Sequence, residues 1–169
     1  MTASDNLSPQ QFSVEHYSIP RNRFEESSVI TTKVDATLSH KTMREPFYRG
    51  HCHALALAIH KDSGHPIGAV YSNNRTVPTH FFNYDKDNPK MGFDATGYRP
   101  VKDIVGVSAN YDHNVKDLVI TPNRHEKVTP EFVVKETSKE GWLPGHHEAA
   151  QAIAPTILKS RRPPRKRKA

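Results

Sequence analysis

One cysteine, one histidine and one aspartate are the residues of this sequence best suited to chemistry. Cys52 lies in GHCHALALAIH, residues 50–60, and is the only cysteine in the chain. His80 follows 28 residues later, and Asp94 comes 14 residues after His80. The thiolate is the reactive form of cysteine, so a nucleophilic cysteine needs a base and a third group that orients the base. In chain order, the three residues suit a nucleophile, a general base and an orienting carboxylate.

The segment around Cys52 predicts a helix over residues 51–63. Good helix formers run through HCHALALAIHKDS, and Gly64 stands where a helix C-cap is expected. The middle of the segment, Ala54 to Ile59, is apolar on every side, which predicts a buried helix. Cys52 is thereby placed at the helix N-terminus, where unpaired backbone N–H groups favour a thiolate and are available to an oxyanion.

Three short strands are predicted next, at 66–72, 79–85 and 90–96. NNRTVP and KDNP separate them and are rich in turn formers. Two neighbouring antiparallel strands bring His80, on the second, beside Asp94, on the third. The predicted fold class is therefore α+β, with a buried helix that carries Cys52 at its N-terminus and packs on an antiparallel sheet.

The rest of the chain gives weaker patterns. We expect a strand within SSVITTKVDATLS (27–39), another element within 101–112, strands at DLVITP and EFVVKE, and a short helix over 146–154 that breaks near Pro155. The expected organisation is a polar lead segment (1–45), a Cys-His-Asp core (46–112), an irregular extension with a short helix (113–158) and a basic tail (159–169).

The order and setting of the three residues resemble the papain-like cysteine enzymes, in particular their transglutaminase-like and arylamine N-acetyltransferase branch. YRGHCHALA resembles the R-G-x-C entry of the acetyltransferases, GFDATG the D-x-T strand of transglutaminase-like domains, and THFF the histidine strand of both. The helix is also similar to the C-H-x-L-A-x-A-L-H helix of small phage- and plasmid-borne domains. Phe81 and Phe82 replace the usual H-x-W pattern, so the substrate class does not follow from the resemblance.

The resemblance implies a papain-like core and a cysteine-dependent acyl-transfer enzyme: a peptidase, amidase, deamidase or transglutaminase-type enzyme that acts on a protein or peptide and needs no cofactor. Cys52, His80 and Asp94 would be catalytic, and Tyr48 and Arg49, just before the cysteine, would contact substrate or pack the helix entry. The alternative is an inactive papain-like structural or accessory protein, for example of a phage particle, whose partners are the other subunits of that assembly.

Two simpler roles for Cys52 stay open. Free cysteines are usually buried filler. A metal site is the other role, since the chain has 11 histidines and His51, His53 and His60 lie near Cys52. However, adjacent helical positions point about 100° apart, so His51, Cys52 and His53 cannot all face one ion from a regular helix. We therefore assign no metal ligands.

The positive charge is concentrated at the C-terminal end of the sequence. The formal net charge is +6, but KSRRPPRKRKA carries seven Lys or Arg and no acid, which leaves −1 for the rest of the chain. The expected phosphate contacts are Lys159, Arg161, Arg162, Arg165, Lys166, Arg167 and Lys168, which would bind nucleic acid without sequence preference. No secretory signal or apolar membrane span is evident, so the expected location is the cytoplasm where the chain is made, or a virion under the accessory alternative.

Overall fold

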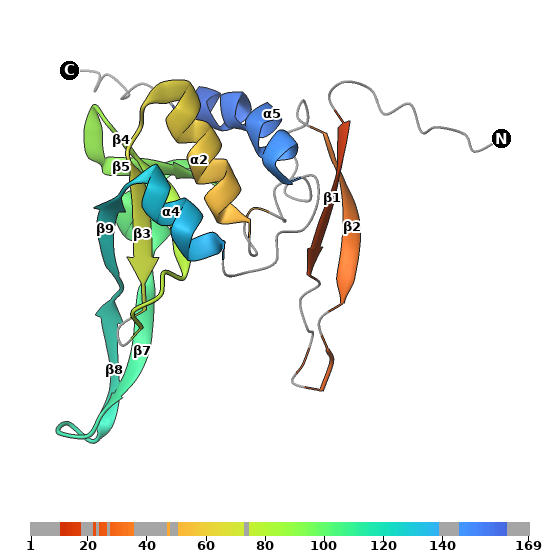
Figure 1. Ribbon diagram of the computed structural model, residues 1–169. Coiled ribbons are helices and arrows are strands. Elements are labelled where there is room, and N and C mark those ends of the chain that lie inside the picture. The colour runs from red at the N-terminus through yellow and green to blue at the C-terminus, as the bar shows by residue number, and fades with distance from the viewer. Residues whose placement is uncertain are drawn as a thin grey trace, which may run out of the picture.

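The computed structural model describes residues 11–17, 22, 24–26, 28–35, 47, 51–72, 75–138 and 146–161. Within these residues the chain is an α+β protein with antiparallel sheets and four helices (Figure 1). The helices are α2 (Cys52–Ser63), α3 (Val101–Val105), α4 (Pro130–Thr137) and α5 (His146–Lys159). The strands are β1 (Gln11–Tyr17), β2 (Val29–Asp35), β3 (Ile67–Tyr71), β4 (His80–Asp85), β5 (Asn88–Asp94), β6 (Gly97–Pro100), β7 (Val107–Asp112), β8 (Asp117–Pro122) and β9 (Arg124–Val128).

A five-stranded antiparallel sheet in the order β6-β5-β4-β3-β9 forms the centre of the fold. Side chains alternate between the faces of a strand, so Phe81 and Phe82 point to opposite sides of the sheet. Phe81 packs in a buried cluster with Ala56 of α2 and Val133 of α4. Phe82 packs in a second cluster with Ile104 of α3. Helices α2 and α4 therefore cover one face, and α3 covers the other.

Helix α2 lies at the middle of the core, as its apolar sequence predicts. Leu55 and Ile59 are buried in a cluster that also contains Ala150 and Ile157 of α5. Gly64 caps the C-terminal end in the left-handed conformation, with φ 74°, and its amide donates to the His60 carbonyl. The helix is thus enclosed between the sheet and α5, and its first residue is Cys52.

The elements predicted around the site are confirmed. The helix expected over 51–63 is Cys52–Ser63, and the strands expected at 66–72, 79–85 and 90–96 are Ile67–Tyr71, His80–Asp85 and Asn88–Asp94. The strand expected within 27–39 is Val29–Asp35, and DLVITP is β8. The segment 101–112 supplies two elements, α3 and β7.

Two predictions in the C-terminal half are wrong. EFVVKE is part of helix α4 and is not a strand, because Thr129 accepts a hydrogen bond from the Phe132 amide and Pro130 occupies the first turn. Helix α5 continues through Pro155 to Lys159. Proline has no amide hydrogen to donate to the carbonyl of Gln151, and both residues lie on the exposed side of the helix. The segment 113–158 is accordingly more regular than expected.

The N-terminal lead segment also contains more structure than the sequence indicated. Strand β1 was not expected, and it pairs with β2 in a separate antiparallel sheet. Val14 of β1 is fully buried in the cluster that joins α2 and α5. None of the helices that the structure describes is long and apolar enough to cross a membrane.

Candidate active site

Cys52 is the first residue of α2, and the residue as a whole is of intermediate exposure. Burial alone raises the pKa of its thiol, but the hydrogen bond and the positive charge of His80, together with the Phe81 and His53 backbones, lower the pKa below its ordinary value. Since each of the lowering contacts favours the anion, the fold stabilises the thiolate. The position at a helix N-terminus acts in the same direction.

His80 is the first residue of β4 and lies between the thiol and a carboxylate. Its Nε2 is 3.3 Å from Oδ2 of Asp94, and its side chain is 20% exposed. Burial alone lowers the pKa of His80, but hydrogen bonds to Asp94 and Cys52 and the negative charges of both raise the pKa to about 10. The imidazolium form is therefore stabilised at neutral pH, and it faces a stabilised thiolate.

Asp94 ends strand β5 and is nearly inaccessible to solvent. One carboxylate oxygen, Oδ1, accepts bonds from the Thr96 amide, at 2.8 Å, and from the Thr96 hydroxyl. The other, Oδ2, faces His80 and pairs with Nη2 of Arg99 at 3.0 Å. Burial alone raises the pKa of Asp94, but the His80, Thr96 and Arg99 contacts lower it to about 2. Asp94 is therefore held as an anion beside His80.

A narrow pocket adjoins the three side chains. About 170 Å³ of non-atom space, its open side included, lies among Cys52, His80, Asp94 and apolar residues such as Phe47, Leu55 and Phe93. Its walls are mainly apolar, which keeps the local dielectric low and strengthens the contacts among the three polar groups.

The structure brings Cys52, His80 and Asp94 together, as the sequence predicted. Tyr48 and Arg49, the expected substrate contacts, lie outside the described residues. Thr96 and Arg99, which hold Asp94, were missed, although both lie in DATGYR immediately after it. The tight β5–β6 turn could have indicated both residues, because it returns the chain alongside Asp94.

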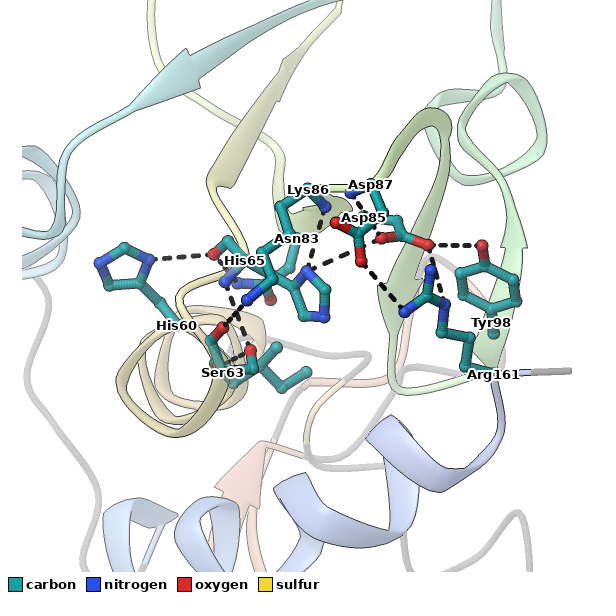
Figure 2. Close-up of polar contacts among 10 residues, drawn as sticks. His60, Ser63, His65, Asn83, Asp85, Lys86, Asp87, Tyr98 and Arg161 are labelled. Atoms are coloured by element: carbon teal, nitrogen blue, oxygen red, sulfur yellow. Dashed lines mark hydrogen bonds and ion pairs between the residues drawn. The ribbon is translucent and has the colours of Figure 1, made fainter. Parts of the chain in front are cut away.

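Arg161, one of the expected phosphate contacts, is exposed and forms ion pairs with two carboxylates of the β4–β5 turn (Figure 2). Its Nε is 3.1 Å from Oδ2 of the fully buried Asp85, and its Nη1 is 3.3 Å from Oδ2 of Asp87. The Tyr98 hydroxyl donates to the same Asp85 oxygen at 2.6 Å. We call Asp85, Asp87, Tyr98 and Arg161 the Asp85 cluster; it fastens the end of α5 to the β4–β5 turn.

Among the other tail residues, Lys159 is exposed at the end of α5. Arg162, Arg165, Lys166, Arg167 and Lys168 lie outside the described residues. Within the described part of the chain, no group of three or more His, Cys, Asp or Glu side chains is arranged to hold a metal ion.

Comparison of the chain with protein-family models, with curated proteins and with solved structures finds no match.

Proposed function

We propose that this chain is a cysteine-dependent acyl-transfer enzyme with a papain-like core, in which Cys52 is the nucleophile, His80 the general acid and base, and Asp94 the orienting carboxylate. The observation that carries the proposal is that Cys52, His80 and Asp94 line one pocket, in which Nε2 of His80 is 3.3 Å from Oδ2 of Asp94. The pKa of the thiol is lowered and that of the imidazole is raised, as expected for a pair that exchanges one proton.

The reaction would proceed in two steps. The Cys52 thiolate attacks a carbonyl or carboxamide carbon, and the imidazolium of His80 gives its proton to the departing amine as the carbon–nitrogen bond breaks. The product of this step is a thioester on Cys52. Water or a second amine then loses a proton to His80 and attacks the thioester, which releases the acyl group and restores the thiolate. Asp94 keeps its charge throughout and holds His80 in place.

The first turn of α2 offers a place for the oxyanion. Backbone N–H groups in the first turn of a helix have no partner within the helix, and the amide of Cys52 belongs to this set. Such N–H groups stabilise the negative oxygen that forms beside the nucleophile.

Substrate would approach from the solvent side of the site. The pocket is narrow, whereas Cys52 and His80 are both partly exposed. A carbonyl group that projects from a peptide or a side chain, such as a glutamine carboxamide, suits this geometry better than a bulky ligand that must be fully enclosed. We therefore favour a protein or peptide substrate.

Reaction with an electrophilic acyl probe tests the proposal. Because Cys52 is the only cysteine, the intact mass of the protein reports its modification directly. We expect rapid formation of one adduct, no adduct with Cys52→Ala, and much slower formation with His80→Asn. His113→Asn is a matched control, since His113 is exposed and lies on the β7–β8 turn.

An adduct that persists in Cys52→Ala ends the proposal. So does a His80→Asn variant that reacts as fast as the His113→Asn control. The second result would favour a chain that keeps the arrangement of the three residues without their activity, which is the accessory-protein alternative.

A further inference from the structure

Strands β7 and β8 form a two-stranded ribbon that is separate from the central sheet. It extends away from the helices and continues beyond the end of β3 (Figure 1). Its base is fixed, because the Asn123 amide donates to the Gly106 carbonyl and the Asn123 side chain donates to the Val105 carbonyl at 2.8 Å. The ribbon is thus a defined projection of the fold.

One face of this ribbon is entirely apolar. Residues that are directly paired across the strands point to the same face. The pairs on this face are Val107 with Pro122, Ala109 with Ile120, and Tyr111 with Leu118. We call these six residues the ribbon face. The opposite face carries Asp112 paired with Asp117.

The ribbon face is exposed to solvent, which is the reverse of the usual arrangement. Its larger members are Val107, 65% exposed, Tyr111, 57%, Leu118, 63%, and Ile120, 64%. An isolated two-stranded hairpin is marginally stable, and a contiguous exposed apolar patch on a protein commonly marks an interaction site. The ribbon face therefore has the composition of an interface.

We propose that the ribbon face pairs with the same face of a second copy of this chain, with the two ribbons antiparallel. The side chains are bulky near the turn, at Tyr111 and Leu118, and smaller at the base, at Val107 and Pro122. A two-fold axis across the middle of the ribbon places the bulky end of each copy against the small end of the other. Ala109 then faces Ala109 of the second copy, at the centre of a self-complementary interface.

Charge and area are consistent with this occupant. The ribbon face has no charged residue, so a second copy meets it without burying a charge, whereas Asp112 and Asp117 point away from the interface. A partner that covered all of this exposed apolar surface would bury about 500 Å² on each copy, or about 1,000 Å² in all, which is the minimum for a biological interface. We therefore expect a weak dimer, with a Kd in about the micromolar range.

Sedimentation equilibrium over a range of concentrations tests for the dimer. We expect Leu118→Lys to raise the dimer Kd by about tenfold or more, because each dimer would bury two lysine charges. Val77→Lys is the matched control, since Val77 is 57% exposed but lies outside the ribbon, and it should leave the Kd unchanged. A chain that is monomeric at every concentration, or a Val77→Lys variant as defective as Leu118→Lys, overturns the proposal.

Cross-linking tests the arrangement and does not depend on whether the lysine variants fold. In a Cys52→Ala background, Ala109→Cys places one thiol at the centre of the ribbon face, and Val115→Cys places one on the turn. A short thiol-specific cross-linker should join two Ala109→Cys chains and leave Val115→Cys chains unlinked, because antiparallel ribbons keep their turns at opposite ends. Equal linking of the two variants, or linking at Val115 alone, contradicts the antiparallel dimer.

Discussion

Replacing His80 by asparagine should change how the reactivity of Cys52 depends on pH. In the wild type, the bond and charge of His80 lower the pKa of the thiol. In His80→Asn both contributions are lost while burial, which raises the pKa, remains. The thiol should therefore titrate at higher pH, and below that pH the variant holds less thiolate than the wild type.

The size of the change in rate follows from how far the pKa of the thiol rises when His80 is removed. Once that pKa lies above the pH, each further unit lowers the thiolate fraction about tenfold. A more basic thiolate is also a better nucleophile, which recovers about threefold of each tenfold loss. Alkylation of His80→Asn at neutral pH should therefore be slower than that of the wild type by about threefold for each unit of pKa.

The rate of alkylation by iodoacetamide, followed by intact mass between about pH 5 and pH 10, is the measurement. Above the pKa of both thiols the order should reverse, since the thiolate of His80→Asn is the stronger nucleophile. The two pH profiles should therefore cross, and that of His113→Asn should follow the wild type. Parallel profiles for wild type and His80→Asn would refute the assignment of His80 as the partner of Cys52.

Three further predictions concern stability and the tail. The lowered pKa of Asp94 contributes stability that is present above about pH 4 and lost as the pH falls through about 2. In urea unfolding, the free energy of unfolding of the wild type should therefore fall by about 2 kcal/mol over this range, and that of Asp94→Asn should lack this decrease. Gly68→Ala should destabilise the fold by about 1–3 kcal/mol in the same assay, because its Cβ would lie 2.5 Å from the buried Phe82 ring; an unchanged denaturation midpoint would contradict this packing. Removing residues 162–169 should abolish nucleic-acid retention and leave Tm unchanged, because Arg161 and its contacts remain. For the full chain, the logarithm of the affinity should fall with the logarithm of the salt concentration by about 0.7–0.9 per phosphate contact. Retention of nucleic acid by the shortened chain would place the binding surface elsewhere.

The site could be predicted from the sequence because local patterns determine each of its elements. The apolar run after Cys52 and the glycine at position 64 define α2, and turn-forming residues separate β4 from β5. Once these elements are adjacent, His80 and Asp94 need only lie near each other on neighbouring strands. The chemistry of the three residues then indicated which contact to expect.

Other features depend on tertiary contacts or on signals that we weighted too little. Asp85 and Arg161 lie far apart in the sequence, and neither residue type indicates that the two form a partly buried ion pair. The helix at 130–137 was missed because the β-branched pair Val133 and Val134 favours a strand, whereas the Thr129 cap and Val133 burial favour a helix. Burial of one face against α2 likewise keeps α5 helical through Pro155.

The packing of α5 on α2 also sets an order for folding during synthesis. Ala150, Ile153 and Ile157 of α5 complete the cluster that encloses α2, yet α5 is the last of the described elements to leave the ribosome. Until then the apolar side of α2 has no α5 to cover it, and the end of α5 has not reached Asp85. We therefore expect the nascent chain to remain a partly ordered intermediate, with a reactive thiol near exposed apolar surface, until its C-terminal helix docks.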